Sequence, residues 1–88
     1  MTKIEVESFS NTTNATVVRL PGRQFPGIVL QGDSLKILFD SASEVVQLSR
    51  GSRIPGLEDS AEEVVRLLNG YRQAYEEALR KHNQSLPY

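Results

Sequence analysis

The sequence has no cysteine, no tryptophan and a single histidine. Without cysteine the chain can form no disulfide, bind no metal through thiolates and use no cysteine nucleophile. One histidine, His82, cannot build a metal site that needs several histidine ligands. We therefore expect no cofactor, and no disulfide framework of the kind that holds many small domains together.

Long apolar runs and an excess of charge of one sign are also missing. No stretch approaches the ~20 apolar residues of a membrane span, and the opening MTKIEVES lacks the apolar core of a signal peptide. Ten basic and eleven acidic side chains leave a formal net charge of -1, whereas nucleic-acid binding needs a clustered basic surface. We expect a cytoplasmic protein whose partners include neither membrane nor nucleic acid.

The composition that remains is that of an ordinary globular domain. Of the 88 residues, 39% are hydrophobic and 24% are charged, and a chain of this length cannot bury two separate cores. We predict a single domain over residues 1–88. Within it we expect a β-rich part at 1–32, a helical hairpin at 33–83 and a tail at 84–88.

Three segments of the first part carry the signals of β-strands. Residues 3–9 alternate polar and apolar side chains, residues 15–20 are rich in β-branched ones, and residues 28–31 form a short run after two prolines. An antiparallel register that gathers the aliphatic side chains on one face pairs Glu5 with Arg19 and places the turn at Asn11–Thr13. The other opposed pairs in that register are Ile4 with Leu20, Val6 with Val18 and Ser8 with Thr16.

After residue 33 the apolar period lengthens to that of a helix. The first helical stripe ends before Gly51, which we expect to cap it. The segment DSAEE opens the second helix, where Ser60 with Glu63 fits a capping box and Asp59 with Glu62 fits it one residue earlier. Segregated strands and helices predict an α+β fold, with a small antiparallel sheet of about three strands covered on one face by a two-helix hairpin. The side chains expected to hold the hairpin together are Leu38, Val45, Leu67, Leu68 and Tyr75.

The segment Q-G-D-S joins the last strand to the first helix, and two interpretations of it remain open. A glycine at a helix start can present free backbone N–H groups to an anion, which makes Gly32, Ser34 and Lys36 candidate anion-binding residues. However, the carboxylate of Asp33 would repel a phosphate, and neither a P-loop nor a dinucleotide motif is present. The simpler interpretation is that Asp33 or Ser34 caps the helix, while Gly32 serves the turn.

Two groups of loop residues are candidates for binding a protein partner. Arg23, Phe25 and Pro26 combine an arginine, an aromatic ring and a rigid loop, a composition typical of interfaces. Phe25 could instead fold back over the edge of the core. Arg50 and Arg53 flank the connection between the helices, where they could converge on an acidic partner or simply be solvated.

The second helix adds two further expectations. Its apolar stripe is longer than the first helix can cover, so we expect a homodimer through its C-terminal half, around Tyr71, Tyr75, Ala78 and Leu79. His82 lies at the end of the same stripe, and as a general base it would need an orienting partner and a nucleophile. Serines are present, but nothing near them resembles a nucleophile elbow. A capping or packing role is therefore favoured over catalysis.

Residues 17–35, VVRLPGRQFPGIVLQGDSL, followed by a helical hairpin and a C-terminal LPY, resemble a family of small bacterial proteins of unknown function. The most specific part is R-x-F-P-G-x-x-x-Q-G-D, from Arg23 to Asp33. The resemblance implies neither an activity nor a catalytic residue. We expect a non-enzymatic protein-binding module, immunity-like or accessory in role; the alternative is a small-ligand or anion-binding domain that uses the helix start at Gly32–Ser34.

Overall fold

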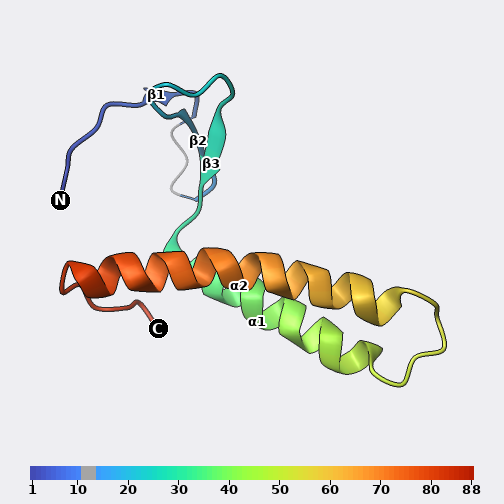
Figure 1. Cartoon of the computed structure of the whole chain (residues 1–88). Helices are drawn as coiled ribbons and strands as arrows, with labels where there is room; N and C mark the ends of the chain where they lie inside the picture. The colour runs from blue at the N-terminus through green and yellow to red at the C-terminus, as the bar shows by residue number, and fades with distance from the viewer. Residues whose placement is uncertain (11–13) are drawn as a thin grey trace. The chain divides into compact units, whose positions relative to one another are not determined.

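The computed structural model describes residues 1–10 and 14–88, and these form two compact units, Met1–Gln31 and Gly32–Tyr88. The first unit holds the strands and the second the helices (Figure 1). The predicted α+β fold is confirmed: a three-stranded antiparallel sheet is followed by two helices that pack together. That the hairpin covers one face of the sheet stays a prediction.

The sheet has the order β1-β2-β3, so strands that are consecutive in the sequence are neighbours in space. Its strands are β1 (Glu7–Ser8), β2 (Thr16–Arg19) and β3 (Gly27–Val29). A tight turn follows β2, in which Arg23 donates its backbone N–H to the carbonyl of Leu20 at 3.1 Å and Gly22 has a φ of 77°. Pro21 and Gly22 therefore hold the two central positions of the turn, which favour a fixed negative φ and a positive φ respectively.

The predicted register of the first two strands is wrong by two residues. Glu7, rather than Glu5, lies opposite Arg19, and Ser8 lies opposite Val18. Arg19 Nη2 donates to Glu7 Oε2 at 2.5 Å, so the expected cross-strand ion pair forms with the next glutamate along. A slip of two residues leaves every side chain on its original face, because the side-chain period of a strand is two. The alternation of apolar residues could not distinguish these two registers.

β1 is also much shorter than the predicted strand over residues 3–9. Phe9 donates its N–H to the carbonyl of Val17 at 2.8 Å, but Val17 in turn donates to the Ser10 side-chain oxygen at 3.0 Å. The serine hydroxyl replaces a backbone acceptor at this point, so the regular ladder ends there. The predicted turn at Asn11–Thr13 lies outside the described residues.

The second unit consists of α1 (Gly32–Ser49) and α2 (Leu57–Lys81). The predicted cap at Gly51 is confirmed, because this residue follows α1 with a φ of 80° and so has the left-handed conformation that ends many helices. The predicted capping box is wrong. α2 begins at Leu57 and its N-cap is Gly56, so Ser60 lies within the first turn, and no side chain among the described residues caps the helix.

The end of α2 explains the position of the single histidine. His82 is the C-cap residue, and Asn83 follows it with a φ of 55°. The backbone N–H of Gln84 returns to the carbonyl of Leu79 at 2.9 Å, and that of Asn83 returns to Arg80 at 3.2 Å. These two bonds form a Schellman motif, in which asparagine takes the left-handed position that glycine usually holds. Neither described helix has the combination of length and apolarity that crossing a membrane requires.

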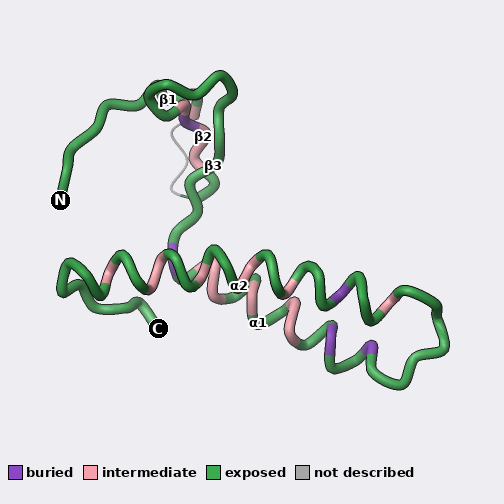
Figure 2. The backbone as a smooth tube through the Cα atoms, in the orientation of Figure 1, coloured by how far each residue is buried: buried purple, intermediate pink, exposed green. Residues whose placement is uncertain are grey.

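The hairpin buries few side chains, and they differ from the predicted ones (Figure 2). Val46 and Ala61 are buried between α1 and α2, together with Ser49, whose hydroxyl donates to the Val46 carbonyl at 2.7 Å. The packing prediction for Leu38, Val45 and Leu67 is wrong, since they are 45%, 49% and 53% exposed. Leu68 and Tyr75 are half-buried and do lie on the packed side.

Candidate functional site

The loop between β2 and β3 brings together the three partner-binding residues predicted in it. Arg23, Phe25 and Pro26 line a hollow of about 320 Å³, whose floor is formed by the sheet residues Val18, Gly27, Ile28 and Val29 and by Leu20, which directly follows β2. We call this surface the Phe25 hollow. Phe25 is 75% exposed, so its ring stands largely in solvent and covers little of the core edge. The loop therefore presents an aromatic ring, an arginine and a rigid proline around an apolar floor.

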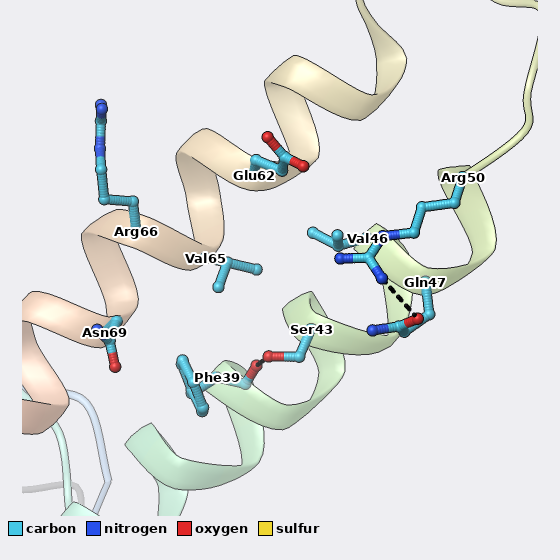
Figure 3. Close-up of a pocket in the computed structure, with 9 residues that line it drawn as sticks. All are labelled: Phe39, Ser43, Val46, Gln47, Arg50, Glu62, Val65, Arg66 and Asn69. Atoms are coloured by element: carbon cyan, nitrogen blue, oxygen red, sulfur yellow. Dashed lines mark hydrogen bonds between the residues drawn. The ribbon is translucent and has the colours of Figure 1, made fainter.

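Arg50 and Arg53, the other two predicted partner-binding residues, lie in different surroundings. Arg50 lines a groove of about 410 Å³ between α1 and α2, and its Nη1 donates to Gln47 Oε1 at 3.3 Å (Figure 3). Arg53 is an exposed residue of the connection between the helices and does not line this groove. The groove does not bring the two arginines together.

The groove in Figure 3 has an apolar floor and a polar rim. Phe39 and Val46 come from α1 and Val65 from α2, and these three side chains form the floor. Its rim consists of Ser43, Gln47, Arg50, Glu62, Arg66 and Asn69. Part of the rim is already paired, since Arg66 donates to Glu63 and the Ser43 hydroxyl donates to the Phe39 carbonyl at 2.9 Å. The groove is therefore a shallow trough with short-range polar pairs along its edges.

The predicted anion site begins at Gly32, the first residue of α1, which is buried. A Cβ atom built on Gly32 would lie 2.0 Å from Tyr75 Cζ and 2.2 Å from its hydroxyl oxygen. Gly32 has no positive φ, so the residue is needed for the close approach of the Tyr75 ring, and the expectation that it serves a sharp turn is wrong. The ring of Tyr75 covers this part of the helix start.

The two polar members of the Q-G-D-S segment act locally. Asp33 Oδ1 accepts the backbone N–H of Ser34 at 2.9 Å, so an aspartate side chain does satisfy a first-turn donor, as the capping interpretation predicted. Asp33 lies one residue inside the helix rather than at its N-cap. Lys36 pairs with Asp40 at 2.5 Å, and its ammonium lies 5.7 Å from the centroids of the Phe39 and Tyr88 rings. Anion binding by Gly32, Ser34 and Lys36 stays a prediction.

Around the C-terminal tyrosine, the described residues form a cluster that the sequence did not predict. Tyr88 donates its hydroxyl to Glu76 Oε2 at 2.7 Å, and Arg72 Nη1 donates to the same oxygen at 2.8 Å. The Arg72 guanidinium lies 4.7 Å from the centroid of the Phe39 ring, and its Nη2 donates to Asn69 Oδ1 at 2.7 Å. This cluster ties the tail to α2 and, through Phe39, to α1. No local sequence motif predicts this cluster, because Tyr88 reaches Glu76 only after the chain reverses at the end of α2.

The cluster changes the acidity of two of its members. Partial burial raises the pKa of Tyr88 to about 12, and its hydrogen bond to Glu76 adds to the effect. The hydrogen bond from Tyr88 in turn lowers the pKa of Glu76, with a further contribution from Arg72. Both shifts favour a neutral phenol that donates to an ionised carboxylate. The geometry therefore stabilises a fixed tail rather than a reactive group.

Comparison with known proteins identifies the family of the chain but not its function. The model of a family described as "Family of unknown function (DUF6959)" matches residues 1–88. No curated protein and no solved structure matches the chain.

Proposed function

The chain belongs to DUF6959, a family of unknown function, and we propose that it is a non-enzymatic module of the bacterial cytoplasm that binds another protein through the Phe25 hollow. The observation that carries this proposal is the exposure of Phe25. A phenylalanine that is 75% exposed, in a loop that contains two prolines, does little for the stability of its own sheet. A phenylalanine ring held in an exposed position can serve as an anchor that a protein partner buries.

The surroundings of Phe25 suit such a partner. Ile28 is 64% exposed and Val29 48%, and both line the hollow beside the ring. Aromatic anchors surrounded by apolar contacts are typical of the centre of an interface, and arginine is enriched there. Arg23 is the charged residue that lines the hollow, so we expect the partner surface to combine an apolar pocket for the ring with a carboxylate within reach of Arg23.

The rival function, anion binding at the start of α1, has weaker support. The Tyr75 ring lies against Gly32, and the negative charge of Asp33 stands at the helix terminus where an anion would have to bind. Lys36 is already paired with Asp40. We therefore give preference to the protein-binding proposal.

The proposal is tested by capturing proteins from the native host with the tagged chain and two variants. Phe25→Ala removes the exposed ring, and Phe9→Ala is the matched control, because Phe9 is a 53% exposed phenylalanine of the same unit that does not line the hollow. We expect the wild-type chain and Phe9→Ala to retain a common protein that Phe25→Ala loses. With that protein purified, Phe25→Ala should weaken binding by about 30-fold or more, the effect of removing an interface anchor.

The opposite pattern would refute the proposal. If all three chains retain the same proteins, or if the wild-type chain retains none above an unrelated tagged protein, the Phe25 hollow is not a protein-binding site. Circular dichroism of Phe25→Ala should match that of the wild type, because the ring that it removes is mostly exposed.

A further inference from the structure

Both helices of the hairpin carry adjacent apolar residues, of which only the second packs inward. The first members are 45–53% exposed, whereas the second members are buried or half-buried between α1 and α2. These pairs are Leu38-Phe39, Val45-Val46, Val64-Val65 and Leu67-Leu68. A single neighbouring helix covers the second residue of each pair and leaves the first one exposed.

The exposed residues of the two helices lie on the same side of the hairpin. A residue one position before the packed one is rotated by about 100° around its helix axis. α1 and α2 run in opposite directions (Figure 1), so this rotation has opposite senses on the two helices when both are viewed from one end. The packed residues of α1 and α2 face each other. Because the preceding residues are rotated away from them in opposite senses on the two helices, both sets lie on the same face of the two-helix layer.

This surface, which we call the apolar face, contains no charged side chain. Its ten residues each precede a packed residue, and all ten are exposed. They are Leu38, Ser41, Val45, Leu48, Ser60, Val64, Leu67, Tyr71, Ala74 and Ala78.

The opposite side of the layer has the contrary character. The ten residues that each follow a packed residue include six charged ones, and the groove of Figure 3 lies among them. They are Asp40, Ser43, Gln47, Arg50, Glu62, Arg66, Asn69, Gln73, Glu76 and Arg80. With 24% of the chain charged, the complete absence of charge on one side and its concentration on the other indicate that the apolar face is covered in the working protein.

We propose that a second copy of this chain covers the apolar face, so that two hairpins form a four-helix bundle. Six of its ten residues are large apolar ones that are 45–76% exposed, and their exposed surface is of the order of the ~300–600 Å² of the largest apolar patch on a typical monomer. With the four smaller residues, the face approaches the ~800 Å² that each partner contributes to a stable interface of standard size. Leu48 and Tyr71, at 76% and 64% exposure, supply the largest single contributions.

The shape and charge of the face favour a second copy as its occupant. A two-helix layer has an open apolar side, and the same layer turned over by a two-fold axis closes it with α1 of one copy against α2 of the other. In a symmetric dimer, a charged residue near the two-fold axis would face its own copy and be repelled by it. The apolar face has no charged residue, so this repulsion is absent. Serine and alanine among the larger side chains would let the two layers approach closely.

This bundle differs from the dimer expected from the sequence, which used the second helix alone. Tyr75 packs against Gly32, and Leu79 is half-buried, so neither is fully available. Tyr71 and Ala78 do lie on the apolar face. The proposal uses both helices, and it is independent of the partner proposed for the Phe25 hollow.

Light scattering after size exclusion at tens of micromolar tests the proposal. The wild-type chain should have twice the mass of its 9.8 kDa monomer. Leu67→Asp places a charge on the apolar face and should halve that mass, whereas Gln73→Asp adds the same charge to the opposite side of α2 and should leave it unchanged. A monomeric wild type, or a Leu67→Asp chain that stays dimeric, would overturn the proposal.

Thiol labelling gives a readout that does not depend on whether Leu67→Asp folds. The chain has no cysteine, so Ser41→Cys, on the apolar face, and Gln47→Cys, on the opposite side of α1, each supply the sole thiol. Both positions are exposed in the single chain. At tens of micromolar a maleimide should modify Ser41→Cys about tenfold or more slowly than Gln47→Cys, and dilution to nanomolar should remove the difference.

The remaining outcomes of the labelling experiment count against the proposal. Protection of Ser41→Cys that persists on dilution in a monomeric chain would mean that the same chain covers its own apolar face. Equal labelling of both thiols at every concentration would mean that the face is free and serves a different partner. Only protection that is lost on dilution, together with a doubled mass, supports the four-helix bundle.

Discussion

Replacing Gly32 with alanine should destabilise the hairpin, whereas the same replacement at Gly70 should stabilise it. A Cβ at Gly32 would lie 2.0–2.4 Å from two ring carbons and the hydroxyl oxygen of Tyr75, so the ring must move out of its packed position. A Cβ at Gly70, in the middle of α2, would meet nothing within 4 Å. Neither glycine has a positive φ, so alanine strains the backbone at neither position.

The expected magnitudes follow from packing and helix propensity. Overpacking costs about 1–3 kcal/mol, and alanine returns up to ~1 kcal/mol of helix propensity, less at the first residue of a helix than in its interior. Gly32→Ala should therefore lose on the order of 1–2 kcal/mol, the difference between these two effects. Gly70→Ala should gain about 0.5–1 kcal/mol, because only the propensity changes there.

Urea unfolding followed by circular dichroism measures both free energies, with all chains at one protein concentration so that association affects them equally. The cause is isolated by repeating Gly32→Ala in a Tyr75→Ala background. Without the ring the penalty should disappear, which a double-mutant cycle reports as a coupling energy. Equal shifts for Gly32→Ala and Gly70→Ala, or a penalty that persists without Tyr75, would refute this account of the helix start.

Three further predictions concern the tail, its arginine and the sheet. Tyr88 has a pKa raised to about 12 from the ordinary tyrosine value of 10.0, so its contribution to stability is complete below pH 10 and is lost as pH rises from 10 to 12. Ultraviolet titration should show one late phenol that Tyr88→Phe abolishes and that Glu76→Gln shifts part of the way to 10. Arg72→Lys loses the second guanidinium hydrogen bond and the flat contact with an aromatic ring, and should cost about 1 kcal/mol in urea unfolding; an unchanged midpoint would contradict this. Nuclear Overhauser contacts between the α-protons of Ser8 and Val18 should be strong, and a contact from Val18 to Val6 instead would restore the register expected from the sequence.

The secondary structure could be predicted from the sequence because its signals are local. Gly51 ends α1 through its own conformation, and the periods of two and 3.6 separate the strands from the helices. The ends of the helices and strands were predicted less accurately where several possible start signals lie within a few residues of one another. Ser60 and Glu63 fit a capping box, yet the helix starts earlier, at Leu57.

The surroundings of Gly32 and Tyr88 could not be predicted, because each depends on a residue far away in the chain. The contact of Gly32 with Tyr75 spans the whole hairpin, and the sequence around Gly32 suggested a turn instead. The hydrogen bond from Tyr88 to Glu76 requires the chain to reverse after α2. The reversal itself is local, since Asn83 takes the left-handed conformation, but a capping asparagine gives no indication of where the tail will attach.

The error in the predicted core has a physical cause that bears on the dimer. Where two apolar residues are adjacent in a helix, periodicity assigns both to the buried stripe and cannot tell which one faces the neighbouring helix. Leu38 was predicted to pack, but it is 45% exposed, and Phe39 beside it packs instead. A stripe one residue wide suffices to close a two-helix hairpin, whereas a stripe two residues wide, repeated on both helices, supplies apolar surface for a second layer as well. The same doublets that misplaced the core in the prediction are therefore the sequence feature that a four-helix bundle requires, and Leu67, the exposed member of the Leu67-Leu68 doublet, is the position where one added charge should separate the two layers while leaving each hairpin folded.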